Sequence, residues 1–414
     1  MATHQTLIQG TVAPGFEAVR KVFERNFREG KELGAACAVY YKGELAVDLW
    51  GGIRDIATQA PWEADTMVPV MSTTKGFSSM AVALAHSRGL IDYDEKVATY
   101  WPEFAQNGKE MVTVRQLLGY QAGLCAIDEP LDLAKIADPD FMAAALAKQK
   151  PAWQPGTKQG YHAFSHGWYQ SELVRRVDPK HRTIGKFFHE EIAQPLGVDF
   201  YIGLPAEIPR SRIAAIKPYK PWQLLLNLHK APWGYVKNFL NKKSLTYRTF
   251  FNPPGFGDIS TYNDSRVQAI EVPAASGIGS PRGMARAYSE FATGGRVLGL
   301  KPETLAELAA PGTRPSEGTY DQVVHIEDIY WSLGFAKPSP IIQFGPTGQS
   351  FGDAGGGGSF AFADPVSQVG FAYAPNRTDL YLHSDPREKS LRDATYRCIA
   401  QLEQQASSRL VTAH

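Results

Sequence analysis

Strand-forming sequence gathers near the two ends of this chain, and helical sequence fills the long stretch between them. Residues 36–52 are predicted to form a β-hairpin, because β-branched and aromatic residues flank a turn at Lys42-Gly43. Strand-like sequence returns at 359–363 and 369–373. From about residue 72 to 270, helical segments are joined by Pro and Gly breaks, and one of these helices is predicted to begin at an N-cap formed by Thr113. We therefore expect both ends of the chain to build one sheet, packed beside a helical part.

This layout predicts an α/β (α+β) protein with two lobes. The sheet lobe is assigned to residues 1–65 and 271–414, and the mainly helical lobe to residues 66–270. Two helices are expected to accompany the sheet, one at about 14–29 and one near the C-terminus. The C-terminal helix places Leu391, Ala394, Cys398, Leu402 and Ala406 on one face. A cleft between the lobes is the expected position of a functional site.

Composition narrows the class of protein. The formal net charge of +1 gives no reason to expect nucleic acid as a partner. The three cysteines are widely separated, which is neither a disulfide framework nor a zinc pattern and suits a reducing compartment. No run approaches the ~18 apolar residues of a membrane span, and residues 1–15 lack the pattern of a secretory signal. We expect a soluble, cytoplasmic protein with no membrane span. The sequence carries no signal for its oligomeric state.

The tetrad Ser72-Thr73-Thr74-Lys75 stands at the start of a continuous helical run. Positions i and i+3 share a helix face, so the Lys75 side chain can reach the Ser72 hydroxyl. The N–H groups at a helix N-terminus favour a developing negative charge, and a buried lysine loses proton affinity and can act as a base. By itself the tetrad is a weak signal, because Ser and Lys are common residues and a capped helix with a solvated lysine shows the same pattern.

The wider sequence resembles the serine β-lactamase/penicillin-binding-protein-like family, most closely the family VIII carboxylesterases. The resemblance covers about residues 35–400. Its segments, in chain order, are 71–76 (MSTTKG), 88–97 (RGLIDYDEKV), 100–104 (YWPEF), 113–118 (TVRQLL), 122–124 (AGL), 154–157 (QPGT), 160–163 (GYHA), 275–280 (ASGIGS) and 357–365 (GGSFAFADP). It implies the two-lobed β-lactamase-like fold, an antiparallel sheet flanked by helices beside a mainly helical lobe.

The resemblance also implies roles for individual residues. Ser72 would be the acylated nucleophile, Lys75 its base partner, and Tyr161 the tyrosine of the family's second motif. A tyrosinate beside a lysine ammonium would form a proton relay. Ala163 stands where the lactamase pattern has an asparagine that contacts the lactam side chain, which favours an esterase.

The family's third motif, Lys-Thr-Gly on an edge strand, is best matched by Asp353-Ala354-Gly355. Glycines at 355 and 356 would let the backbone approach the substrate, and an N–H near Gly356 would complete an oxyanion hole. The same glycines are equally typical of a tightly packed strand end. Asp353 replaces a lysine, so we expect it to repel a substrate carboxylate.

Two other motifs in the sequence point to different chemistry. Gly348-Gln349-Ser350-Phe351-Gly352 fits the Gly-x-Ser-x-Gly elbow of α/β-hydrolases, but strand-like sequence follows where the elbow needs a helix. His162 and His166 have metal-compatible helical spacing, yet no third ligand presents itself. We expect neither a metal nor a cofactor.

Residues 205–250 form a basic, aromatic segment with Glu207 as its one acidic residue. Its first interpretation is a helical excursion packed on the helical lobe. Its second is a lid or wall of the acyl pocket, and a membrane-surface contact is the third. Trp233 of this segment, and His162 beside Tyr161, are predicted to line the substrate pocket.

Together these features predict a serine carboxylesterase that hydrolyses small uncharged acyl esters through an acyl-enzyme on Ser72. Its partner would be a small-molecule ester. A β-lactamase or DD-peptidase, an acyltransferase of the same fold, and a non-catalytic scaffold remain alternatives.

Overall fold

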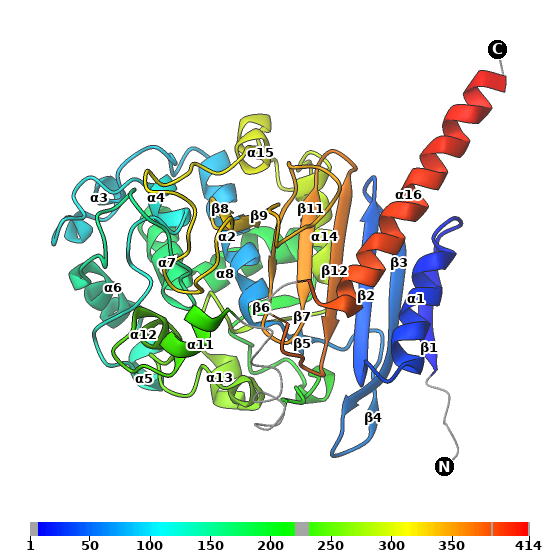
Figure 1. The fold of residues 1–414 in the computed structure, drawn as a ribbon, viewed down its shortest axis with the longest axis horizontal. Coiled ribbons are helices and arrows are strands. Elements are labelled where there is room, and N and C mark those ends of the chain that lie inside the picture. The colour runs from blue at the N-terminus through cyan, green and yellow to red at the C-terminus, as the bar shows by residue number, and fades with distance from the viewer. Residues whose placement is uncertain (1–6, 220–231, 382–383, 413–414) are drawn as a thin grey trace.

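A nine-stranded antiparallel sheet dominates one half of the molecule (Figure 1). The computed structural model describes residues 7–219, 232–381 and 384–412. Within them the strand order is β1-β3-β2-β12-β11-β10-β9-β8, and β4 pairs with β3. The strands of this sheet are β1 (Ile8–Val12), β2 (Gly34–Tyr41), β3 (Glu44–Asp55), β4 (Ala60–Pro61), β8 (Tyr330–Ser332), β9 (Phe335–Lys337), β10 (Phe351–Ala354), β11 (Phe360–Asp364) and β12 (Val369–Pro375). Both ends of the chain therefore build one sheet.

Helices occupy the remaining volume. The longer ones are α1 (Glu17–Arg28), α2 (Thr74–Ser87), α6 (Pro139–Lys148), α7 (Ser165–Val177), α14 (Pro281–Ala292), α15 (Pro302–Ala309) and α16 (Pro386–Thr412). The shorter ones are α3 (Val97–Tyr100), α4 (Val114–Leu118), α5 (Leu133–Ile136), α8 (Ile184–Phe188), α9 (Gln194–Leu196), α11 (Trp233–Phe239), α12 (Leu245–Phe250) and α13 (Ser265–Ala269). None of the helices described here has the length and apolar character needed to cross a membrane.

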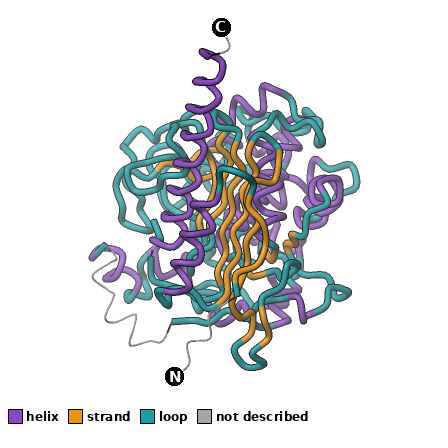
Figure 2. The backbone as a smooth tube through the Cα atoms, turned by 90° about the vertical axis from the view of Figure 1, so that its right-hand side faces the viewer, coloured by secondary structure: helices purple, strands orange, loops and turns teal. Residues whose placement is uncertain are grey.

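The two faces of the sheet differ in side-chain size. On β12, Val369, Phe371 and Tyr373 pack in a cluster with α1 and α16, which cover one face (Figure 2). Ala372 and Ala374 point to the opposite face, where α14 lies. Successive residues of a strand alternate between faces, so this pattern gives one bulky layer and one thin layer. The thin layer lets α14 approach the strands closely.

The C-terminal helix only partly follows its predicted face. Leu391, Ala394 and Cys398 are buried against the sheet, as expected. Leu402 is half-buried and Ala406 is exposed, because α16 continues beyond the end of the sheet (Figure 1). The predicted apolar face therefore continues into the last turns of α16, where no part of the sheet covers it.

The helical half is built around α2, which is surrounded by protein on every side, so that nearly all of its residues are buried. A helix that is buried all round belongs in the core of a large domain. Thr113 begins α4 with a capping box: its side chain accepts from the Gln116 N–H, and the Gln116 side chain accepts from the Thr113 N–H. The predicted N-cap at Thr113 is therefore confirmed.

A second, three-stranded sheet lies at the boundary between the two halves. Its order is β5-β7-β6, with β5 (Val68–Pro69), β7 (Gly277–Gly279) and β6 (Phe200–Ile202). These strands come from both sides of the predicted division at residues 65 and 271. The small sheet therefore links the two proposed lobes, and β5 leads directly into Ser72.

The thin face of the sheet predicts a sensitive position at Gly370. A Cβ atom there would lie 2.4 Å from the Ala285 carbonyl oxygen and 2.4 Å from the Ser289 nitrogen, both in the backbone of α14. We expect Gly370→Ala to lower the free energy of unfolding by about 1–3 kcal/mol, the range for overpacked cores. Gly348→Ala is the matched control, since nothing lies within 4 Å of its Cβ position, and it should stay within about 0.5 kcal/mol. Urea unfolding followed by circular dichroism measures both. Equal stability of the two variants would contradict the proposed close packing.

Candidate active site

Ser72 lies where the small sheet meets helix α2. The chain leaves β5, passes Val70, whose N–H donates to the Gly277 carbonyl, and makes a 3₁₀ turn over Met71–Thr73 before α2 begins. Met71 has a φ of 44°, an uncommon left-handed conformation for a residue with a side chain. The Ser72 side chain remains half-buried at one end of a pocket, while its neighbours on both sides are buried.

The Lys75 amine is buried beneath Ser72. Its Nζ lies 3.1 Å from Ser72 Oγ, 2.8 Å from the Ala163 carbonyl oxygen and 3.0 Å from the Ala274 carbonyl oxygen. Burial lowers the pKa of Lys75 to about 7, and the Asp353 carboxyl group opposes that shift. The structure therefore places Ser72 and Lys75 together, as their spacing indicated. The two carbonyl groups were missed, because every residue carries one and no sequence signal marks them.

Tyr161 approaches Ser72 from the other side. Its hydroxyl donates to Ser72 Oγ at 2.8 Å, and Lys75 Nζ lies 4.8 Å from the centre of its ring. Burial raises the pKa of Tyr161, although its hydrogen bond with Ser72 acts in the opposite direction. The raised pKa favours the neutral phenol in the resting site, and the proton relay through a tyrosinate stays a prediction.

The glycine turn after β10 faces the same pocket. Gly355 and Gly356 line it, and the Gly355 N–H donates to the Ser359 carbonyl at 2.8 Å. Among the described residues, neither the Ser72 N–H nor the Gly356 N–H has a hydrogen-bond acceptor. Both groups are therefore available to an oxyanion. The strand before the turn is not at the sheet edge, because β10 pairs with β9 and β11, so the expected edge strand is wrong.

Asp353 lines the pocket but lies deeper than the sequence suggested. Its side chain is 3% exposed, and Oδ2 has no hydrogen-bond partner among the described residues. Burial raises the pKa of Asp353 well above its ordinary value, while Lys75 acts in the opposite direction. Burial therefore disfavours the negative charge of this carboxyl group, and the nearby Lys75 amine favours it. Burial thus acts against the full negative charge that was expected to repel a substrate carboxylate, and that repulsion stays a prediction.

The close approach of Tyr288 to α2 explains a glycine in the nucleophile motif. A Cβ atom at Gly76 would lie 3.4 Å from Asp353 Oδ2 and 1.9 Å from the Tyr288 hydroxyl. Any larger residue would displace the buried hydroxyl of Tyr288 from its place against the helix.

The pocket beside Ser72 has a volume of about 190 Å³ and mainly apolar walls. None of the described residues that line it is Lys, Arg or His. Besides Ser72, Tyr161, Asp353, Gly355 and Gly356, the lining residues are Tyr235, Phe250, Val324, Ile326, Ile329, Trp331, Ala336, Ile341, Ile342, Ala354 and Tyr381. Such walls suit an uncharged acyl group.

The described part of the 205–250 segment contributes to this pocket. Tyr235 of α11 and Phe250 of α12 both line it, as expected for a pocket wall. Residues 220–231 of the segment lie outside the described residues. Trp233 is 77% exposed and does not line the pocket, so the prediction chose the correct helix but the wrong residue. Residues two positions apart on a helix point to nearly opposite sides, which explains the difference.

The predicted pocket residue His162 and the alternative nucleophile Ser350 are both buried away from the pocket. His162 is fully buried, its Nδ1 lies 2.6 Å from the Gly160 carbonyl oxygen, and burial lowers its pKa to about 3. It does not line the pocket, so that prediction is wrong. Ser350, the serine of the alternative Gly-x-Ser-x-Gly motif, is 0% exposed and does not line the pocket either.

Comparisons with known proteins agree on one family. The sequence profile of the beta-lactamase family matches residues 19–394. The esterase/beta-lactamase LipL of Mycobacterium tuberculosis (strain ATCC 25618 / H37Rv) is 32% identical over 369 residues, covering 89% of this chain and 82% of LipL.

Solved structures agree. The crystal structure of a family VIII carboxylesterase is 38% identical with a TM-score of 0.83, and covers 95% of this chain and 100% of its own. A penicillin-binding protein homologue from Caulobacter crescentus is 35% identical with a TM-score of 0.81, and likewise covers 95% and 100%. The fold, the Ser72–Lys75–Tyr161 arrangement and these matches lead to one conclusion: the chain belongs to the beta-lactamase family.

Proposed function

We propose that this protein is a serine carboxylesterase that hydrolyses small, uncharged acyl esters through an acyl-enzyme on Ser72. One observation carries the proposal: the Ser72 hydroxyl lies between the Lys75 amine and the Tyr161 phenol, at the end of an apolar pocket whose described lining has no cation. The similarity to a family VIII carboxylesterase and to LipL, named an esterase/beta-lactamase, supports hydrolysis of the esterase type.

The contacts of Lys75 define which proton moves first. A neutral amine has two N–H donors and one lone pair. The carbonyls of Ala163 and Ala274 can only accept, so they take the two N–H groups. The lone pair is then left for Ser72, whose O–H donates to Lys75. Because the pKa of Lys75 is about 7, a large share of the amine is neutral at physiological pH.

Acylation follows from this arrangement. Ser72 Oγ attacks the ester carbonyl carbon while Lys75 takes its proton, and the N–H groups of Ser72 and Gly356 stabilise the oxyanion. The C–O bond to the alcohol then breaks. Tyr161, a neutral donor beside Ser72 Oγ, protonates the leaving alkoxide and regains a proton from the Lys75 ammonium. Water attacks the acyl-enzyme by the reverse proton path, which releases the acid and restores Ser72.

The first test separates the two candidate nucleophiles. Ser72→Ala should reduce ester hydrolysis by at least about a thousandfold, because the covalent step is lost. Ser350→Ala should retain most of it, since Ser350 is buried away from the pocket. Kinetics with p-nitrophenyl butyrate measure both, and circular dichroism checks folding. A folded but inactive Ser350→Ala variant, together with an active Ser72→Ala variant, would reverse the assignment.

The second test uses pH. Lys75 must be neutral to accept the Ser72 proton, and it loses its own proton above its folded pKa. The value of kcat/KM for a neutral ester should therefore rise with pH and level off above about 7. Lys75→Met should lose at least about a hundredfold in rate.

Lys337 offers a matched control for this profile. It is also buried, with a pKa lowered to about 7, but its amine donates to the Leu308 carbonyl at the end of α15. Lys337→Met should keep the wild-type pH midpoint. A midpoint that disappears in this variant, or that survives in residual Lys75→Met activity, would show that Lys75 is not the titrating base.

The third test concerns substrate charge. Penicillins and cephalosporins carry a carboxylate, and an unpaired charge in an apolar pocket costs several kcal/mol. We expect kcat/KM for p-nitrophenyl butyrate to exceed that for nitrocefin by about a hundredfold or more. Asp353→Asn should change both by less than about threefold, because burial already disfavours the negative charge of this carboxyl group. Equal hydrolysis of nitrocefin by the wild type would instead favour the β-lactamase alternative.

A further inference from the structure

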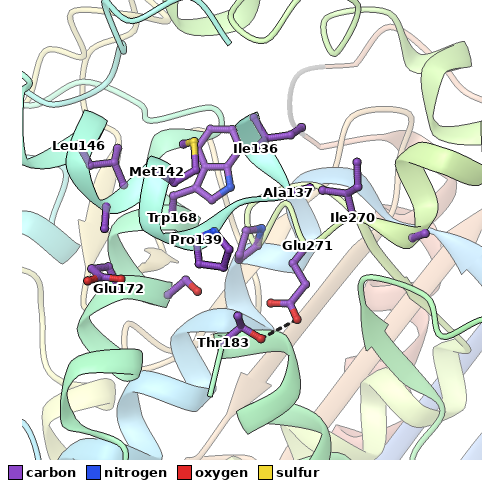
Figure 3. A pocket seen from close by; sticks show the side chains of 14 residues that line it. Ile136, Ala137, Pro139, Met142, Leu146, Trp168, Glu172, Thr183, Ile270 and Glu271 are labelled. Atoms are coloured by element: carbon purple, nitrogen blue, oxygen red, sulfur yellow. Dashed lines mark hydrogen bonds between the residues drawn. The ribbon is translucent and has the colours of Figure 1, made fainter. Parts of the chain in front are cut away.

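A second cavity lies within the helical half and shares no lining residue with the pocket beside Ser72 (Figure 3). Its volume is about 210 Å³. Its walls come from α6, α7 and the segment before β7, and they include Met142, Leu146, Trp168 and Ile270. An engineered cavity of about 150 Å³ is enough to hold benzene. The cavity therefore has room for a six-membered ring with a small substituent.

One polar group in this wall lacks a partner. The Trp168 side chain is 5% exposed, and its Nε1 has no hydrogen-bond acceptor among the described residues. An indole N–H can only donate, and a buried donor left unsatisfied is costly. Figure 3 shows the indole among the lining side chains, with its nitrogen edge turned toward the side where Ala137 and Ile270 lie. An occupant with an acceptor oxygen would satisfy it.

The acids of the wall limit the charge of such an occupant. Glu172 is paired with Arg175 at 2.8 Å and with Arg176 at 2.6 Å. Glu271 forms no salt bridge with a described residue; it accepts from Thr183 Oγ1 at 2.7 Å, as the dashed line in Figure 3 shows, and from the Gly185 N–H at 3.1 Å. An anion would meet this acid, which no described residue neutralises through a salt bridge.

We propose that this cavity is a second small-molecule site, which takes a neutral, largely apolar ring with one acceptor oxygen for the Trp168 N–H, and that its occupant influences Lys75. The coupling rests on the proposed role of Lys75 as the base, whereas the binding does not.

The coupling has a short structural path. Pro273 lines the cavity, and its carbonyl accepts from Ser78 Oγ at 2.5 Å. The next carbonyl along the chain, that of Ala274, accepts from Lys75 Nζ. Gly167, beside Trp168, packs so closely on this segment that a Cβ there would lie 2.4 Å from the Ala274 nitrogen. An occupant that contacts Trp168 and Pro273 therefore presses on the segment that orients the Lys75 amine.

Binding is tested by following the indole ¹H–¹⁵N signal of Trp168, assigned with a Trp168→Phe variant, during titration with benzyl alcohol. We expect a saturable downfield shift with a Kd of about 1 mM. Toluene has the same ring without the oxygen and should bind about fivefold more weakly, with no downfield shift. No saturable shift with benzyl alcohol up to about 20 mM, or equal behaviour of the two ligands, would overturn the site.

A pair of variants on α6 locates the binding. Ala143 is buried and lines the cavity, so Ala143→Leu should remove most of the binding. Ala144, its exposed neighbour on the same helix, is the matched control, and Ala144→Leu should bind as the wild type does. Unchanged binding in Ala143→Leu would overturn the assignment to this cavity.

The coupling is tested by ester hydrolysis at saturating benzyl alcohol. We expect kcat to change at least about twofold in the wild type and in Ala144→Leu, but not in Ala143→Leu. The same response in all three would overturn the coupling, because it would come from the Ser72 pocket. The Trp168 signal reports binding without any catalysis, so failure of the proposed esterase function would be distinguishable from failure of the site.

Discussion

The buried amine of Lys75 is the interaction on which the rest of this site depends. It joins the start of α2 to the segments before α7 and β7, through the carbonyls of Ala163 and Ala274. Burial is what lowers its pKa, so its function as a base requires that α2 be surrounded by protein on every side. The large helical half of the molecule supplies that surrounding.

The sheet contributes the opposite wall of the site. Its thin alanine face lets α14 pack closely. Strand β10 places Asp353 beside α2, and the glycine turn that follows β10 lies beside Ser72 in the pocket. The C-terminal helix secures that turn: Arg387 at its start donates to the Gly357 carbonyl at 3.0 Å and is paired with Asp385 at 2.6 Å. Residues distant in the sequence thus fix the backbone that is proposed to hold the oxyanion.

Features of short range could be predicted from the sequence. The hairpin at 36–52, the cap at Thr113 and the reach of Lys75 to Ser72 each depend on spacing within a few residues. Tyr161 could be found only through resemblance to a family, because nothing local marks one tyrosine as the partner of a serine 89 positions away.

Features of long range could not be predicted. Whether Asp353 is charged depends on its burial against α2, and whether Trp233 or Tyr235 faces the pocket depends on the rotation of α11. His162 stands next to Tyr161 in the sequence yet is turned into the core. Composition and spacing do not encode these orientations; tertiary packing decides them.

The most direct test of the proposed chemistry is to trap the covalent intermediate. Enzyme quenched in acid during turnover of p-nitrophenyl butyrate should show, by mass spectrometry, a fraction heavier by one butyryl group. Peptide mapping should place that group on Ser72, and the adduct should be absent from Ser72→Ala. A butyryl group on Ser350, or sustained hydrolysis in Ser72→Ala, would contradict the account.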